Sequence, residues 1–274
     1  MLKRVASLFN CGLVVILLLL WVVWETSALP TSVFVVHCEP TRANPVMWIE
    51  LTKLVAQAEA RNIPLTLDFS PQWASMILAD ETKIALLESW IESGHEIGCH
   101  HHGYWGTKDR GSTWDGYTNT PLIQIDPEDL KRYQGTMDDY MALLTALPGE
   151  RVSGCLGTSN SGDDVDYPCQ LIYSTRGQAL LDAVSQPTNV TLNGCDVWEL
   201  SHALIASQDR GALADLYLET DDVNVFSVVG HVYNYAAFPD LFEQWFSFLA
   251  SLDAMGTWRR TVSGVLGART PSAQ

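Results

Sequence analysis

The N-terminal half of the chain alternates between short apolar runs and longer amphipathic stretches. Residues 33–37 and 65–69 are short runs of apolar and β-branched side chains, which is typical of buried strands. A third strand is expected at residues 95–98, and an amphipathic stretch that starts after Asp80 and stops at Gly94 predicts a helix before it. Apolar residues at helical spacing predict an earlier helix, through Met47, Leu51, Leu54, Val55 and Ala58. These alternations predict a parallel sheet or barrel with its chemistry at the carboxyl ends of the strands.

The C-terminal half has a less regular pattern. Residues 103–125 show no clear period and predict a long loop, whereas Asp126 and Pro127 begin a single helix that is expected to continue to Pro148. Residues 151–168 are rich in Gly, Ser and Asp and predict another loop. The remaining expected elements are strands at 171–173, 197–200 and 224–229, a closing helix around 242–252, and a short strand or helix within 258–266.

The first thirty residues have the pattern of an export signal. Lys3 and Arg4 precede an apolar run of roughly 12–15 residues, and small residues follow it up to Ala28. The run is shorter than the ~20 residues that span a bilayer comfortably, although an uncleaved anchor remains an alternative. We therefore expect residues 1–28 to be a signal peptide or N-terminal membrane anchor, and residues 29–274 to form one extracytoplasmic domain of α/β-barrel size.

The composition limits the partners. The formal net charge is −16 at pH 7, and so acidic a chain lacks the basic footprint that nucleic acid requires. An oxidising compartment permits disulfides, and the pair we expect is Cys155 with Cys169, in one loop-rich region. Cys38 and Cys99 are expected to be small buried apolar residues. The oligomeric state is left open by the sequence.

A cluster of histidines lies at the end of the third expected strand. Four of the seven histidines, His95, His100, His101 and His102, stand within residues 95–102. This density of imidazole side chains indicates a metal site, the alternative being an exposed polar loop. Other polar residues also follow expected strands, namely Glu39, Asp68 and His231.

The segment Gly-His-Glu-Ile-Gly-Cys-His at residues 94–100 resembles the polysaccharide deacetylases of the NodB-homology superfamily. In that family one strand end supplies an aspartate pair, such a Gly-His segment supplies metal-binding histidines, and a late strand ends in a catalytic histidine. The stretches that correspond here are residues 35–39, 94–100 and 228–231. Residues 196–200 also resemble a family strand that ends in Glu-Leu-Pro, with Ser201 in place of the proline. The likeness follows the chain in order over most of residues 33–250.

This resemblance implies a fold, an ion and a reaction. The fold would be a distorted, often incomplete (β/α) barrel, and the ion a divalent metal, usually zinc. The reaction would be hydrolysis of an acetyl amide or ester on a carbohydrate. A metal held by one acid and two imidazoles keeps open positions for water and for the acyl oxygen. By position, Glu39 and His100 would be metal ligands, and His231 would be the catalytic acid.

The chain departs from the family pattern at two positions. Cys38 stands where the family has its first aspartate, the usual base, and Asp68 at the next strand end is our candidate replacement, or else an acid that caps backbone amides. Tyr104 stands where the family has its second histidine. In an extended segment His102 would face the same way as His100, so we expect His102 to be the third metal ligand; a helical segment would make this wrong.

Several residues around these positions receive weaker expectations. His95 and Glu96 are expected to be buried supporting residues, His101 to face away from the site, and His202 to be structural. Four aromatic residues are candidates for a sugar-stacking rim, with burial in the core as the commoner outcome: Trp105, Trp114, Tyr117 and Tyr233.

The sequence leaves two other functions open. Cys38 and Tyr104 at motif positions are compatible with a carbohydrate-binding module that keeps the barrel and has lost catalysis. A metal-free glycoside hydrolase would instead use two carboxylates such as Glu39 and Glu199, which must then lie within about 10 Å of each other.

Overall fold

The structure is a computed structural model that describes residues 28–104, 114–148, 152–156 and 168–267. The expected signal or anchor therefore lies almost wholly outside the described residues. Within the described ranges, the helices are too short or too polar to cross a membrane.

The N-terminal half folds as the hydrophobic pattern predicts. The Asn44 side chain accepts hydrogen bonds from the first turn of the first long helix, and Asp80 caps the helix before the histidine strand in the same way. Gly94 ends that second helix with a φ of +96°, a conformation that favours glycine. A short helix that the sequence did not predict begins at Pro71. The elements are β1 (Thr31–Cys38), α2 (Pro45–Glu59), β2 (Thr66–Phe69), α3 (Pro71–Leu78), α4 (Glu81–Glu92) and β3 (Glu96–His101).

Two expectations for the middle of the chain are wrong. The single helix expected from Asp126 to Pro148 is instead a 3-10 turn, η4 (Asp129–Arg132), followed by α5 (Met137–Thr145). The break occurs because Thr136 and Asp139 form a capping box that starts a new helix after Gly135. The expected loop at 151–168 contains strand β4 (Val152–Leu156), which pairs in parallel with β3. Its pairing partner, rather than its Gly- and Ser-containing composition, makes it a strand.

The remaining elements agree with the predicted positions, with boundaries shifted by a few residues and additional short elements. The segment around 258–266 forms both a short strand and a short helix. These elements are β5 (Tyr173–Arg176), β6 (Val184–Ser185), β7 (Thr188–Leu192), β8 (Cys195–Ser201), β9 (Ala203–Leu204), α7 (Arg210–Glu219), β10 (Val225–His231), α8 (Val232–Ala237), α9 (Pro239–Leu252), β11 (Arg259–Arg260) and α10 (Val262–Gly267).

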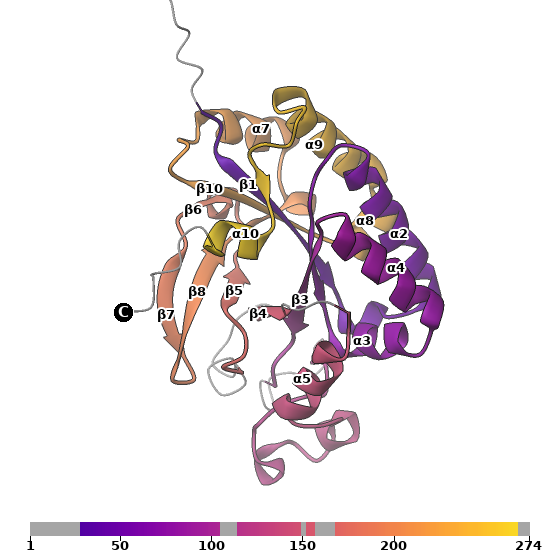
Figure 1. Ribbon diagram of the computed structural model, residues 1–274. Helices are drawn as coiled ribbons and strands as arrows, with labels where there is room; N and C mark the ends of the chain where they lie inside the picture. Colours follow the sequence, from indigo (N-terminus) through magenta and orange to yellow (C-terminus); the bar gives the residue numbers. More distant parts are fainter. Residues whose placement is uncertain (1–27, 105–113, 149–151, 157–167, 268–274) are drawn as a thin grey trace, which may run out of the picture.

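The strands form a distorted, incomplete barrel. The main sheet has the order β4-β3-β2-β1-β10-β6, with β11 beside β1 and β9 beside β10, and β1 to β4 and β10 are parallel. A second sheet, β5-β8-β7, stands across from it, with β5 beside β4 and β8 beside β6. Figure 1 shows helices α2, α4, α8 and α9 on the outer side of the main sheet and the second sheet on the other side. The barrel-type fold expected from the sequence is confirmed in this open form.

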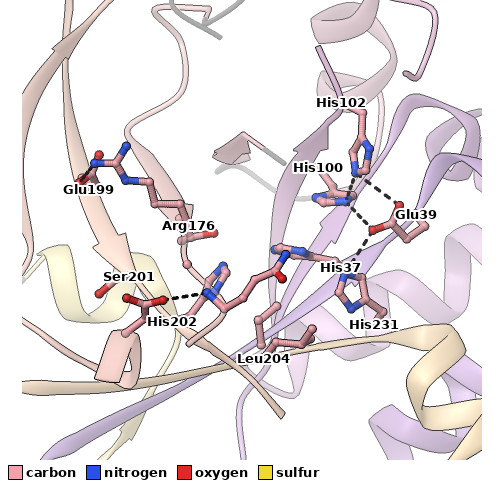
Figure 2. Close-up of a pocket in the computed structure, with 15 residues that line it drawn as sticks. His37, Glu39, His100, His102, Arg176, Glu199, Ser201, His202, Leu204 and His231 are labelled. Atoms are coloured by element: carbon pink, nitrogen blue, oxygen red, sulfur yellow. Dashed lines mark hydrogen bonds and ion pairs between the residues drawn. The ribbon is translucent and has the colours of Figure 1, made fainter. Parts of the chain in front are cut away.

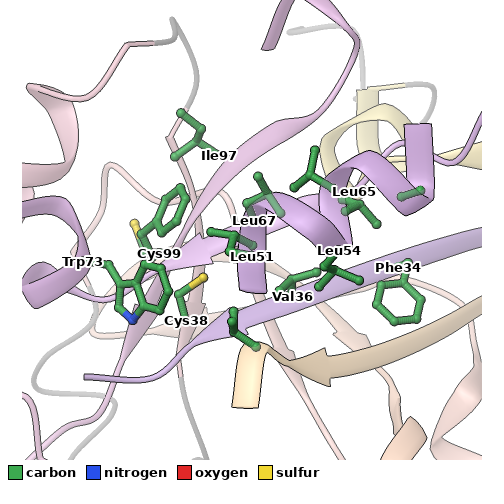
Figure 3. Packing of buried hydrophobic residues seen from close by; sticks show 14 of the residues in the cluster. Phe34, Val36, Cys38, Leu51, Leu54, Leu65, Leu67, Trp73, Ile97 and Cys99 are labelled. Atoms are coloured by element: carbon green, nitrogen blue, oxygen red, sulfur yellow. The ribbon is translucent and has the colours of Figure 1, made fainter. Parts of the chain in front are cut away.

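Strand β1 divides its side chains between two environments. Phe34, Val36 and Cys38 pack in the large core between the main sheet and the helices (Figure 3). Val33 and Val35 face the interior, in a second apolar cluster shared with residues of β5 and β8. Because side chains alternate along a strand, the next interior positions are those of His37 and Glu39. The interior thus changes from apolar to polar at the carboxyl ends of the strands.

The disulfide joins a different pair of cysteines from the expected one. Cys169 is bonded to Cys195, across 26 positions of sequence, with their Cα atoms 5.4 Å apart. The expected pairing of Cys169 with Cys155 is therefore wrong. The sequence did not reveal that Cys195 begins β8 close to Cys169, whereas Cys155 lies in β4. Cys38 and Cys99 are buried free thiols, as expected.

Candidate metal centre

Four side chains from three parallel strands meet at the carboxyl end of the barrel. Glu39 follows β1, His100 lies in β3, His102 follows β3 and His231 ends β10. Figure 2 shows the three imidazoles directed at the Glu39 carboxylate. The chain brings together residues almost two hundred positions apart because β1 is the direct neighbour of β10 in the sheet.

The contacts between these side chains are short. Glu39 Oε1 lies 3.3 Å from His100 Nε2 and 3.2 Å from His231 Nε2, and Glu39 Oε2 lies 3.3 Å from His102 Nε2. The Nε2 atoms of His100 and His102 are 2.7 Å apart. All four residues are at most 9% exposed. The ligand atoms of Glu39, His100 and His102 lie within 4.8 Å of one another, which makes them a candidate metal-binding set.

His102 and Tyr104 are directed to different sides of the chain. The chain is extended at residues 100–102, so His100 and His102 face the interior while His101 faces α5 and contacts Tyr140. Tyr104 packs against Trp114, and its hydroxyl accepts a hydrogen bond from the Asp126 backbone N–H. Tyr104 is therefore directed away from the Glu39 carboxylate, and His102 is directed towards it.

Burial and hydrogen bonding set the charge of the cluster. Burial lowers the pKa of His100 to about 4, and the neighbouring His102 adds to the effect, so the His100 imidazole is neutral at pH 7. Burial alone would raise the pKa of Glu39, but hydrogen bonds with the three histidines hold it well below its usual range. An ionised carboxylate beside a neutral imidazole is the protonation state that metal ligands require.

The donor set fits a divalent transition metal. One carboxylate and two imidazoles are a common protein donor set for zinc, with coordination positions left for water and substrate. Glu39 Oε1 contacts His100 and Glu39 Oε2 contacts His102, each at 3.3 Å, so the two histidines flank one carboxylate. With one ligand atom taken from each residue, the three atoms lie within 4.8 Å of one another, which is close enough for the three residues to hold one ion.

His231 is held by a different partner at each ring nitrogen. Its Nδ1 atom lies 2.8 Å from Asn234 Oδ1, in the first turn of α8, and its Nε2 atom is directed at Glu39. An amide oxygen can only accept, so Nδ1 carries a proton and Nε2 is the nitrogen that can exchange one in the site. Asn234 was not singled out by the sequence.

Asp68 lies deeper than expected. It is fully buried on β2, outside the cavity wall, where its Oδ2 atom is 3.9 Å from His37 Nε2 and its Oδ1 atom is 3.4 Å from the Tyr173 hydroxyl. The expected direct role of Asp68 as a base is not supported by this position. His37, which the sequence did not indicate, lies between Asp68 and the cavity, and its ring stacks on that of His100 with the ring centroids 4.2 Å apart. The alternation that places Glu39 in the interior could have identified His37.

A cavity of about 530 Å³ opens over the cluster. One wall is formed by the cluster of Glu39 and the three histidines that contact it, and the facing wall comes from β5, β8 and the turn after β5. Glu199 lies on the facing wall, opposite Glu39. Its Oε1 atom is ion-paired with Arg176 at 2.6 Å. The lining residues are His37, Glu39, His100, His102, Thr175, Arg176, Gly177, Gln178, Asp182, Glu199, Ser201, His202, Leu204, Val229 and His231.

The aromatic residues considered for a sugar-stacking rim do not form one among the described residues. Trp114 and Tyr117 belong to buried clusters, and Tyr233 stacks on His231 at 4.8 Å without lining the cavity. Trp105 lies outside the described residues. The cavity is lined mainly by polar and charged residues, with Leu204 and Val229 also in its wall, so it offers a ligand both hydrogen bonds and apolar contact.

The other histidines divide between support and cavity. His95 accepts a hydrogen bond from the Leu65 N–H, and Glu96 accepts hydrogen bonds from Ser263 at the start of α10, so both are buried supporting residues. His202 is also buried, but it lines the cavity and lies 5.4 Å from His37. A purely structural role for His202 therefore does not follow from its position.

Comparison with known proteins supports the fold. No family model matches the chain, and no curated protein matches it in sequence. A solved structure from Mycobacterium smegmatis, provisionally assigned as a polysaccharide deacetylase, covers 91% of this chain and 98% of its own, with 13% identity and a TM-score of 0.51. This likeness shows that the chain has a polysaccharide deacetylase-type fold.

Two further solved structures are less similar. A family 4 acetyl xylan esterase from Clostridium thermocellum, solved with a cobalt ion, covers 87% of this chain and 91% of its own, with 12% identity and a TM-score of 0.48. A 4-alpha-glucanotransferase from Thermococcus litoralis covers 88% of this chain but 38% of its own, with 12% identity and a TM-score of 0.45.

Proposed function

We propose that this protein is an exported, metal-dependent hydrolase that removes N- or O-linked acetyl groups from a carbohydrate. The observation that carries the proposal is the convergence of Glu39, His100 and His102 at the strand ends, with His231 in contact with Glu39. By analogy with the solved structure that shares this fold, acetyl hydrolysis is the reaction we assign to this site. The motif at residues 94–100 supports the same reaction.

Glu39, His100 and His102 would hold the divalent ion, zinc in our proposal. When bound, the ion would act as a Lewis acid towards the acyl oxygen and would lower the pKa of a bound water molecule towards about 7.

His231 would protonate the leaving group. Water oxygen adds to the acyl carbon, the C–N or C–O bond to the sugar breaks, and the proton at His231 Nε2 passes to the departing nitrogen or oxygen, leaving acetate. The contact of Nδ1 with Asn234 holds the ring so that Nε2 remains directed into the cavity.

His37 would take the proton of the attacking water, in place of the aspartate that the resemblance implies at position 38. His37 lines the cavity, whereas Cys38 lies in the core between sheet and helices. Burial and the neighbouring histidines hold the pKa of the His37 imidazole well below its usual value, so the imidazolium would be short-lived. Asp68, whose Oδ2 atom is 3.9 Å from His37 Nε2, would stabilise it while it exists. This assigns the acid Asp68 a supporting role in the reaction.

Export and carbohydrate binding complete the proposal. We infer that residues 1–28 direct or tether residues 29–274 outside the cytoplasm, and the disulfide between Cys169 and Cys195 is of the kind that forms in oxidising compartments. A polar cavity of about 530 Å³ is large enough for a sugar residue with its acetyl group.

Acetate release tests the proposed function. The purified protein, loaded with zinc, is incubated with acetylated xylan and with N-acetylglucosamine oligomers, and free acetate is measured. We expect release from one of these classes, loss of release after chelation of the metal, and loss in His231→Ala at unchanged zinc content. Absence of bound metal in the unsubstituted protein would reject the proposal.

A binding module is the second candidate, and one observation favours it. The Cys38 side chain lies in the core, so the carboxylate that serves as base in the family has no equivalent beside Glu39 in the cavity. Retention of acetylated oligomers without acetate release, at full zinc content, would support this candidate over the enzyme.

A further inference from the structure

The third proposed ligand, His102, lies just beyond the last residue of β3. The strand ends at His101, whose position is paired with Leu156 of β4. Pairing with a neighbouring strand therefore fixes the direction of His100 but stops short of His102. Some other contact must hold the chain extended for one more residue, or the His102 ring would not remain 3.3 Å from Glu39.

Asp115 makes that contact, at both main-chain polar groups of His102. The His102 N–H donates to Asp115 Oδ2 at 3.1 Å, and the Asp115 N–H donates to the His102 carbonyl at 3.2 Å. Asp115 Oδ2 also lies 2.7 Å from His101 Nδ1. One carboxylate oxygen thus holds the His101 ring on the α5 side and the His102 backbone in line, which directs the two side chains to opposite faces.

Asp115 is itself held in place from several directions. Its Oδ1 atom accepts the Tyr117 N–H at 3.0 Å, and its carbonyl accepts from Gln72 of α3 at 2.6 Å. The turn needs glycine at position 116, where φ is +92° and a Cβ would come within 2.4 Å of the Arg132 carbonyl oxygen. Asp115 is 2% exposed and His101 is fully buried, so these hydrogen bonds are shielded from water.

We propose that Asp115 is a positioning residue that sets the direction of His102 for metal binding. The inference rests on the proposed metal site and deepens it. The resemblance implies a second histidine four residues after the first, and here that position holds Tyr104, which is directed elsewhere. The spacing of two residues between His100 and His102 suits an extended chain, and Asp115 is what keeps this chain extended.

Zinc affinity tests the role of Asp115. Full-length protein is stripped of metal, and zinc binding is measured by competition with a chromophoric chelator for the unsubstituted protein, Asp115→Asn and Asp115→Ala. Removal of a residue that orients a metal ligand typically costs 10–100-fold in affinity, which is the loss we expect for both variants. The matched control is Glu96→Gln, because Glu96 is a buried acid of β3 that contacts Ser263 and Tyr173 and is not among the residues that line the cavity.

The outcomes separate a positioning role from a structural one. The Tm of the metal-free protein is expected to fall in Asp115→Asn and in Glu96→Gln alike. Zinc affinity is expected to fall in the Asp115 variants alone. Hydrogen exchange in metal-free protein should become faster at the His102 amide in Asp115→Asn and remain unchanged at the Ile97 amide. Unchanged zinc affinity in Asp115→Asn, or an equal loss in Glu96→Gln, would overturn the inference and leave the proposed function standing. Lack of zinc binding by the unsubstituted protein would overturn both.

Discussion

The Nε2 atoms of His100 and His102 lie 2.7 Å apart, although the two rings belong to neighbouring inward positions of one extended segment. Glu39 completes the candidate metal-binding set from the end of β1, two strands away in the sheet. These three ligands therefore come from two chain segments, and their geometry depends on how residues 100–102 leave the sheet.

His102→Ala should abolish tight zinc binding, because two protein ligands remain where three are needed to hold the ion firmly. Tyr104→Phe should retain full zinc content and lose about 1 kcal/mol of stability, since its hydroxyl accepts a hydrogen bond from the Asp126 backbone. Metal analysis after gel filtration measures both variants. Loss of zinc in Tyr104→Phe with retention in His102→Ala would show that Tyr104, and not His102, is the ligand.

His37→Gln and Asp68→Asn should each lower kcat while leaving zinc content unchanged. Loss of a general base typically costs 10²–10⁴-fold, and we expect the larger effect for His37, which lines the cavity. Because Asp68 acts through His37, the double variant should be no slower than His37→Gln alone.

Tyr173→Phe is the control for these two variants. The Tyr173 hydroxyl lies 3.4 Å from Asp68 Oδ1, whereas the other oxygen, Oδ2, faces His37, so loss of the hydroxyl should lower kcat less than Asp68→Asn does. Full additivity of His37→Gln and Asp68→Asn would show that the two residues act separately.

Acid should destabilise the metal-free protein through its buried histidines. Burial, opposed by Glu59, lowers the pKa of His95 from 6.5 to about 4. Below pH 6.5 His95 binds a proton in the unfolded chain but stays neutral in the folded protein. Its contribution to the free energy of unfolding is therefore full above pH 6.5 and falls as the pH drops towards 4. The contribution of His95 across this window is roughly 3 kcal/mol.

The substitution His95→Asn isolates this contribution. An asparagine oxygen can still accept the Leu65 N–H that His95 Nδ1 accepts at 3.0 Å, but it does not titrate. Urea unfolding at pH 7 and pH 4.5 should show a smaller difference between the two pH values for His95→Asn than for the unsubstituted protein. An identical difference would mean that His95 is protonated in the folded state.

The disulfide between Cys169 and Cys195 should stabilise the domain. Closing a loop of 26 positions is worth about 3 kcal/mol of chain entropy in the unfolded state. Cys169→Ser and Cys195→Ser should therefore lower Tm by similar amounts, with little further loss in the double variant. Mass spectrometry of a tryptic digest without reductant checks the pairing directly, and a peptide linking Cys155 to either residue would contradict it.

The sequence was most informative where a local pattern decides the structure. Alternation along an extended chain correctly placed His101 on the opposite side from His100, and the caps at Asn44 and Asp80 begin helices where periodicity suggests. The barrel-type fold followed from strand and helix order together with the motif at residues 94–100.

Long-range contacts account for what the sequence did not show. Strand β4 exists because β3 supplies its partner, and Cys195 reaches Cys169 because of where β8 starts. Asp68 was considered from its place at a strand end, but register puts it beside His37, one layer below the cavity. Asp115 could not be selected at all, because nothing in a loop sequence indicates that its carboxylate meets the His102 backbone.

The position of Cys38 limits how this site can change. Its thiol lies among Leu51, Trp73 and Cys99, on the face of β1 that the helices cover (Figure 3). Installing the family's aspartate there would place a carboxylate in an apolar core and leave the cavity unaltered. The chain is therefore separated from the usual active-site pattern by more than one substitution. A side chain of β1 reaches the cavity only from an interior position such as 37 or 39, and the residue at position 38 contributes to the core instead.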